Sequence, residues 1–210
     1  MPPKAEFSWL IFFLMSAIFL GSVVMFFTLV RRWTVNRRWT TLQAWARDHG
    51  FRHERSDQTP PPPLDDLHLI PQLVVSSGPI TLIDFSPLTS EDQLPIRVLH
   101  RQIDWPLAPA GLRPMAAQVS LLDRFSLHPY PLITSNERFL AIGVDSLAAR
   151  RVADALRTLL PADLGLLIHH RSLIIDFSAR HFDAIEFDRM IALSDQLVAH
   201  LPPASTRSEK

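Results

Sequence analysis

A run of 24 residues without a charged side chain, from Phe7 to Val30, constrains this 210-residue chain more than any other feature. Fifteen of these residues are Leu, Ile, Val or Phe, and Arg31 and Arg32 close the run abruptly. At about 1.5 Å per residue, a helix of this length spans roughly 36 Å, which exceeds the roughly 30 Å hydrocarbon core of a bilayer. The run therefore predicts a transmembrane helix over residues 7–30.

Two other interpretations of the run stay open. A cleaved signal peptide would begin with basic residues and have a shorter apolar stretch, whereas the only basic residue before this run is Lys4. A helix buried in a soluble protein would need a core large enough to surround 24 apolar residues, which the remaining chain could hardly supply. We expect a signal anchor that crosses the lipid bilayer once.

The flanks of the run have the residue types found at membrane interfaces. An indole ring near each end can be buried while its N–H stays hydrated. Basic residues crowd the carboxy-terminal flank, which predicts that the rest of the chain is cytoplasmic. We call these basic residues, Arg31, Arg32, Arg37 and Arg38, the arginine collar. They either contact anionic lipid headgroups or act only as a topology signal. The expected interface residues are Trp9, Arg31, Arg32, Trp33, Arg37 and Arg38.

Ala17 and Gly21 lie one helical turn apart inside the run. Small residues at this spacing allow two membrane helices to approach closely. The pair therefore predicts a helix–helix contact and a possible homodimer, although many helices that do not dimerise carry the same spacing.

Composition excludes several classes of function. From Trp39 to Lys210 there are 16 basic and 20 acidic residues, and this mildly acidic balance argues against nucleic acid as a partner. The chain has no cysteine, which excludes disulfides, thiolate metal sites and thiol nucleophiles. Its six glycines are scattered singly, so no phosphate-binding loop or nucleophile elbow is present. We therefore expect no cofactor.

The pattern beyond the anchor predicts an α+β fold, in which one soluble domain has a mainly antiparallel sheet and two or three packed helices. Thirteen of the 18 prolines lie between Pro60 and Pro131, which predicts short strands and long loops there. We expect helices from Ser146 to Leu159 and from about Phe187 to Leu201. Strands are expected at 51–55, 72–76, 80–85, 96–103, 116–122 and 139–144, with a hairpin formed by 165–169 and 172–177.

The predicted organisation has five parts. A short tail (1–6) precedes the transmembrane helix (7–30), and the collar with an amphipathic helix (31–50) follows it. The soluble domain covers 51–203, and the tail 204–210 is expected to be disordered. The sequence leaves open whether the amphipathic helix begins anew near Thr41 or continues the transmembrane helix.

The segment from Leu42 to Phe51, Leu-Gln-Ala-Trp-Ala-Arg-Asp-His-Gly-Phe, has a Trp-Ala pair and a glycine followed by an aromatic residue. It resembles the segment that follows the anchor in uncharacterised bacterial single-pass membrane proteins. This resemblance covers about ten residues and implies no activity.

Two aspartates are the best candidates for a pair of catalytic carboxylates. Asp84 and Asp176 occupy equivalent places in the similar stretches Ile80–Ser86 and Ser172–Ser178. Strands related in this way could bring two acids together for acid–base or metal chemistry. Alternatively, each aspartate precedes a turn by two residues and could simply bind backbone N–H groups.

Three histidines are candidates for a metal site. His169 and His170 are adjacent in an expected strand, so their side chains point to opposite faces and need a bulge to share an ion. Adding His181 would complete a set of three ligands. The alternative is that all three are surface or turn residues.

The sequence favours a membrane-tethered interaction or scaffolding domain with a membrane-protein partner. Two alternatives stay open: a membrane-bound hydrolase that uses Asp84 and Asp176 or the three histidines, and an accessory subunit of a membrane complex. An enzyme is the less favoured class, because no catalytic motif is recognisable.

Overall fold

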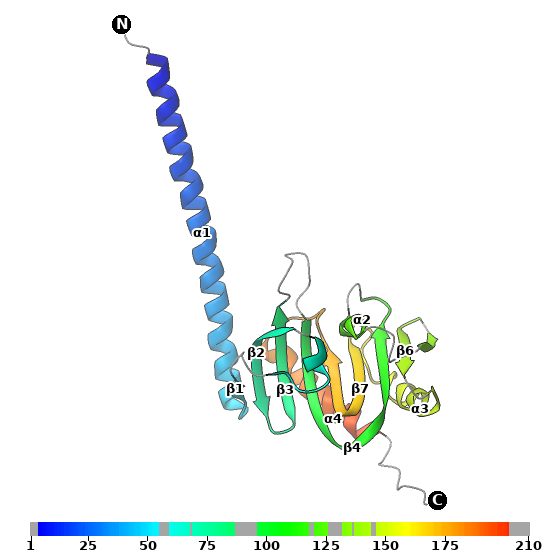
Figure 1. Ribbon diagram of the computed structural model, residues 1–210. Coiled ribbons are helices and arrows are strands. Elements are labelled where there is room, and N and C mark those ends of the chain that lie inside the picture. The colour runs from blue at the N-terminus through cyan, green and yellow to red at the C-terminus, as the bar shows by residue number, and fades with distance from the viewer. Residues whose placement is uncertain are drawn as a thin grey trace, which may run out of the picture. The chain divides into compact units, whose positions relative to one another are not determined.

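The computed structural model describes residues 4–54, 59–67, 69–86, 96–117, 120–125, 132–135, 137–143 and 146–201. The chain divides into two units, Met1–Ala44 and Trp45–Lys210. Figure 1 shows the elements in chain order. They are α1 (Lys4–Asp48), β1 (Arg52–Glu54), the 3-10 helix η1 (Leu64–Leu67), β2 (Ile70–Ser77), β3 (Ile80–Ser86), β4 (Ile96–Pro114), α2 (Leu121–Arg124), β5 (Leu132–Ser135), β6 (Phe139–Gly143), α3 (Ser146–Leu156), β7 (Gly165–Asp176) and α4 (Ala184–His200).

Helix α1 is continuous over 45 residues. The helix that the sequence placed after the collar therefore continues the preceding one, and no new helix begins near Thr41. Gly50, with a φ of 70°, lies in the left-handed region just beyond the end of α1. Among the described residues, no helix is long and apolar enough to cross a membrane, so the span over 7–30 stays a prediction.

The second unit is built on a seven-stranded sheet in which all described pairs are antiparallel. Its order is β1-β2-β3-β4-β6-β5, and β7 also pairs with β4. With its helices, this sheet confirms the predicted α+β class and the mainly antiparallel pairing.

Strand β4 organises the sheet because it pairs along both edges. On one edge its first half pairs with β3 and its second half with β6, whereas β7 follows the other edge from Val98 to Leu112. The register with β7 shifts on both sides of Leu107, next to Pro106 and Pro109, which have no N–H to donate. Figure 1 shows β4 bent sharply at its middle, with β7 inside the bend.

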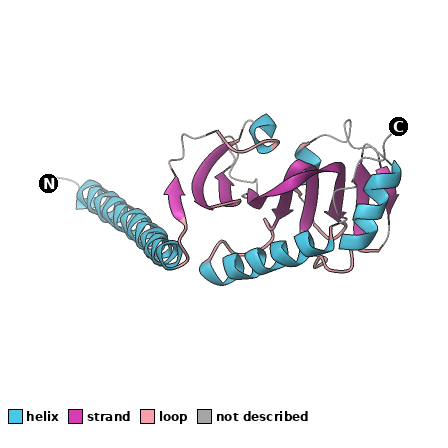
Figure 2. Ribbon diagram, turned by 90° about the horizontal axis from the view of Figure 1, so that it is seen from below, coloured by secondary structure: helices cyan, strands magenta, loops and turns pink. Residues whose placement is uncertain are grey.

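The two faces of the sheet are covered by different elements. Leu64 of η1 and Leu121 and Leu122 of α2 join a buried cluster that includes Val98 of β4. Helix α4 lies on the opposite face, where Ser194 accepts a hydrogen bond from Arg101. Figure 2 shows α4 along one side of the strands and η1 on the other.

Several predicted elements match the structure, and two do not. The strands predicted at 72–76, 80–85 and 139–144 are β2, β3 and β6, and the two predicted helices are α3 and α4. The predicted strand at 116–122 is wrong, because Ser120 caps helix α2 there. The predicted hairpin at 165–177 is wrong as well, because β7 is one continuous strand paired with β4. The tail 204–210 lies outside the described residues.

Candidate functional site

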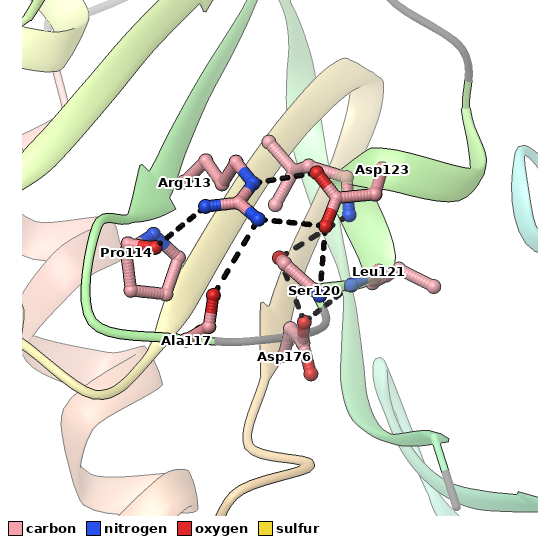
Figure 3. Close-up of polar contacts among 8 residues, drawn as sticks. Arg113, Pro114, Ala117, Ser120, Leu121, Asp123 and Asp176 are labelled. Atoms are coloured by element: carbon pink, nitrogen blue, oxygen red, sulfur yellow. Dashed lines mark hydrogen bonds and ion pairs between the residues drawn. The ribbon is translucent and has the colours of Figure 1, made fainter. Parts of the chain in front are cut away.

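Asp176 is the centre of a buried polar cluster. It is the last residue of β7 and only 4% exposed. One carboxylate oxygen accepts hydrogen bonds from Ser120 Oγ (3.0 Å) and from the Leu121 N–H (2.6 Å). The other accepts from the N–H (3.1 Å) and Oγ (2.5 Å) of Ser178. Both oxygens are therefore occupied, and Asp176 joins the end of β7 to the start of α2 (Figure 3).

A second carboxylate completes this cluster. Ser120 and Asp123 form a capping box, in which Asp123 accepts from the Ser120 N–H at 3.1 Å. Arg113 at the end of β4 donates to both oxygens of Asp123, at 2.5 and 2.9 Å. Burial is the largest single influence on Asp123 and raises its pKa. The hydrogen bonds from Arg113 and from the Ser120 N–H, together with the positive charge of Arg113, outweigh burial, so this pKa lies below its ordinary value. The cluster thus joins the end of β4, the start of α2 and the end of β7 through a salt bridge and a helix cap.

Gly165 shows how closely the two ends of β7 approach each other. A Cβ added at Gly165 would lie 3.1 Å from the Cβ of Asp176, 3.2 Å from Leu122 Cδ1 and 3.3 Å from Ser120 Oγ. These contacts are tighter than ordinary van der Waals distances. A side chain at the first residue of β7 would therefore require its neighbours in the Asp176 cluster to shift.

The structure does not bring Asp84 and Asp176 together. Asp84 lies opposite Arg97 in the β3–β4 register, and Asp176 lies opposite Val98 in the β4–β7 register. Residues directly opposite each other share a face, whereas neighbours such as Arg97 and Val98 point to opposite faces. The two carboxylates consequently lie on different faces of the sheet.

Asp84 has an unusual environment of its own. Its Oδ1 lies 3.9 Å from Arg97 Nε, and neither atom has a hydrogen-bond partner among the described residues. Burial raises the pKa of Asp84 to about 6, and the positive charge of Arg97 opposes this rise only in part. Asp84 is thus the described carboxylate that is most costly to keep ionised.

His100 and Ser172 form a pair that superficially resembles a nucleophile and its base. His100 Nε2 lies 3.0 Å from Ser172 Oγ, and this hydroxyl donates to the Pro62 carbonyl at 3.0 Å. Because the hydroxyl proton is used there, His100 Nε2 must carry a proton and donate to Ser172. This polarity is the reverse of nucleophile activation, and His100 Nδ1 has no described carboxylate partner to orient it. Burial lowers the pKa of His100 to about 4, so the ring is neutral at pH 7.

The predicted histidine site lies partly outside the described residues. His169 and His170 are neighbours in β7, and exposed His181 follows that strand by five residues. The side chain of His170 lies outside the described residues. Within the described part of the chain, no three His, Cys, Asp or Glu side chains are placed to hold one metal ion.

Sequence reasoning missed an ionic network around Arg180, which lies between β7 and α4. Arg180 donates to both oxygens of Asp163, at 2.6 and 2.9 Å, and lies 3.2 Å from Glu186. Glu186 also pairs with Arg189, and it is buried although it is a carboxylate. The only sequence signal was an N-cap aspartate, Asp183, followed three residues later by a glutamate.

An aromatic cluster at Trp45 was also missed. Trp45 is 7% exposed, and its ring centroid lies 5.0 Å from those of Phe51 and Phe187. Its Nε1–H donates to Asp188 of α4 at 2.9 Å, and His49 stacks on its ring. The last turn of α1 is therefore part of the core of the second unit.

The predicted membrane residues are described only in part. Trp9 is 61% exposed, and further large apolar side chains of α1 up to Phe27 are exposed as well. The side chains of Arg31, Arg32, Trp33, Arg37 and Arg38 lie outside the described residues. Ala17 and Gly21 are exposed, and a Cβ added at Gly21 would meet nothing within 4 Å.

Comparison with known proteins finds a likeness of fold. No protein-family model and no curated protein sequence matches the chain. Among solved structures, the chain is similar to the crystal structure of the mycobacterial trehalose monomycolate transport factor A, TtfA, with a TM-score of 0.55 and 15% identity. The match covers 78% of this chain and 96% of that one. At this identity the likeness shows a shared fold and nothing about activity.

Proposed function

We propose that this protein is a membrane-anchored accessory protein, whose folded unit from Trp45 onward binds a partner protein at the membrane surface. The observation that carries the proposal is the uncharged run, read together with the exposure of its side chains. Twelve large apolar side chains between Trp9 and Phe27 are 58–70% exposed and occur on every side of α1. The anchor is inferred from the whole run in the sequence, which includes positions whose side chains are not described.

Lipid is a better match than a protein groove for such a helix. Exposed residues at 12–22 and 24–27 surround the helix, whereas a groove-binding helix shows a single apolar stripe. The arginine collar follows directly and is suited to anionic headgroups at the cytoplasmic surface. The tether would confine the folded unit to two dimensions and so raise its effective concentration toward membrane partners.

An accessory role is favoured over hydrolysis for two reasons. Asp84 and Asp176 lie on opposite faces, and Asp176 already accepts four hydrogen bonds. The fold is similar to that of a protein described as a transport factor, and an accessory protein of a membrane transport complex is therefore the favoured form of the proposal. If Asp84→Asn and Asp176→Asn proteins both stayed folded and lost a measured hydrolytic activity, the hydrolase would be the better interpretation.

The anchor is tested by alkaline carbonate extraction of membranes. Apolar residues of the run contribute roughly −4 to −9 kcal/mol to insertion, and each central arginine costs about 2.5–3.5 kcal/mol. We expect the wild type to stay in the membrane pellet, and the double variant Phe19→Arg/Leu20→Arg to be released. The matched control places the same charges at exposed apolar positions of the folded unit, Leu147→Arg/Ile185→Arg, and should stay in the pellet. Release of the wild type would refute the anchor.

The partner is tested by cross-linking in intact membranes of the source cells. We expect a discrete adduct with a membrane protein that is formed by the wild type and by the Leu147→Arg/Ile185→Arg control. The Phe19→Arg/Leu20→Arg variant should lose the adduct because it is no longer concentrated at the membrane. A wild-type protein that inserts but forms no adduct would leave the anchor in place and refute the accessory role.

A further inference from the structure

Asp84 and Arg97 form a half-buried ion pair without a hydrogen bond between the two side chains. Their side chains are only 23% and 20% exposed, yet the nearest atoms, Oδ1 and Nε, are 3.9 Å apart. Both atoms are buried without a hydrogen-bond partner among the described residues. An ionised carboxylate in this position has lost water and has gained no hydrogen bond in return at that oxygen.

Arg97 also contacts the segment leading into α4, which Asp176, Asp163 and Glu186 contact as well. Its Nη1 donates to the Arg180 carbonyl, and its backbone N–H donates to Ser178 Oγ at 3.0 Å. The Phe177 N–H donates to the Arg97 carbonyl at 2.9 Å. We call residues 178–183, from Ser178 to the N-cap Asp183, the entry segment. One guanidinium therefore lies between two acceptors, the Asp84 carboxylate and the Arg180 carbonyl.

The other described charges near this guanidinium pair with groups other than Asp84. On the β2 side the residue opposite Asp84 is Leu73, which is apolar. Beyond Arg97, the Arg180 side chain pairs with Asp163 and Glu186, and Arg189 pairs with Glu186. In the described part of the chain, Arg97 is the one ion-pair partner of Asp84. A change in the charge of Asp84 therefore acts first on Arg97.

We propose that Asp84 and Arg97 form a proton-controlled latch on the entry segment of α4. When the carboxylate has taken a proton from solvent, the neutral acid does not compete for Arg97, and the guanidinium stays on the Arg180 carbonyl. When Asp84 is ionised, it attracts Arg97 across the 3.9 Å gap and gains water if the segment opens. The entry segment is therefore closed at low pH and opens more often at higher pH.

The raised pKa of Asp84 places this change near pH 6. If opening returns the carboxyl to its ordinary pKa of 3.8, the opening equilibrium rises about tenfold between about pH 5 and about pH 7.5. The change would extend to the first turns of α4, where Glu186 contacts Arg180 and Asp188 contacts Trp45.

Amide hydrogen exchange on the full-length protein tests the latch. After correction for the intrinsic pH dependence of exchange, peptides covering residues 178–190 should exchange about tenfold faster at about pH 7.5 than at about pH 5. Asp84→Asn should be protected at both pH values. Asp195→Asn removes an exposed carboxylate of α4 that pairs with Arg101, and it should keep the wild-type pH dependence.

Arg97→Gln provides an independent variant, because it removes the guanidinium and should give fast exchange of the entry segment at both pH values. An Asp84→Asn protein with the wild-type pH dependence would overturn the proposal. A wild-type protein whose entry segment exchanges equally at both pH values would overturn it as well.

Discussion

Replacing Asp176 with asparagine should destabilise the folded unit strongly, because the amide cannot accept at both ends. The carboxylate accepts from two backbone N–H groups, those of Leu121 and Ser178, and from two hydroxyls. Hydroxyl groups can rotate to accept from the new NH₂ group, but a backbone N–H cannot. Whichever way the amide is turned, one of the two N–H groups loses its acceptor.

The expected loss follows from these contacts. A buried polar group left without a partner costs about 1–3 kcal/mol, and hydrogen bonds to a charged group exceed those to a neutral one by about 1 kcal/mol. We expect Asp176→Asn to lower the free energy of unfolding by about 3 kcal/mol. Urea unfolding of the full chain in detergent micelles, followed by circular dichroism of the sheet, measures this loss.

Asp66→Asn is the matched control, because Asp66 is an exposed aspartate in η1. Its effect should stay within about 0.5 kcal/mol. A loss below about 1 kcal/mol for Asp176→Asn would refute the reasoning that both carboxylate oxygens are required. It would mean that the backbone N–H left by the amide finds an acceptor that the described contacts do not provide.

Three further predictions concern other parts of the folded unit. Gly165→Ala should lower the free energy of unfolding by about 1–3 kcal/mol in the same urea assay, because the new methyl group meets Asp176, Leu122 and Ser120 at 3.1–3.3 Å. Gly78→Ala, where a Cβ would meet nothing within 4 Å but φ is 55°, is a comparison that reports backbone strain alone. Trp45→Phe should cost about 1–2 kcal/mol, because it removes the hydrogen bond to Asp188; Asp188→Asn keeps an acceptor oxygen and should be close to neutral. The free energy of unfolding of Asp84→Asn should equal that of the wild type below about pH 4 and exceed it above about pH 6, by at most about 3 kcal/mol. The reason is that the raised pKa of Asp84 makes the wild type lose stability as pH rises between those values. Thermal unfolding across this pH range checks the sign, and a wild type that gains stability relative to the variant as pH rises would contradict it.

Local patterns were sufficient for the elements whose signals lie within a few residues. Short apolar runs rich in β-branched residues marked β2 and β3, and the apolar periodicity of α4 ended where Pro202 follows. The capping box of Ser120 and Asp123 was also local, but the prediction of a strand at 116–122 overlooked it. The extent of β4 could not be predicted, because Pro106 and Pro109 normally exclude a central strand. Here the register shifts next to these prolines, and the strand bends instead of ending.

The candidate carboxylates show where local information ends. The similarity of Ile80–Ser86 and Ser172–Ser178 correctly placed both aspartates near strand ends. Which face each side chain points to depends on the registers of β3 and β7 against β4, which are contacts between residues far apart in the chain. A shift of one residue in either register would have put the two acids on one face.

The sequence by itself determined the uncharged run, the absence of cysteine and of phosphate-binding loops, and the α+β class, because each depends on composition or on a short period. Only the tertiary structure decided that α1 is continuous into the folded unit through Trp45, that Asp176 is saturated by hydrogen bonds, and that Asp84 is buried against an incompletely paired arginine. The physical reason is that burial and hydrogen-bond partners are set by packing between distant segments. The pKa and reactivity of a carboxylate depend on this burial and on these partners, and its neighbours in the sequence affect them only by influencing the packing.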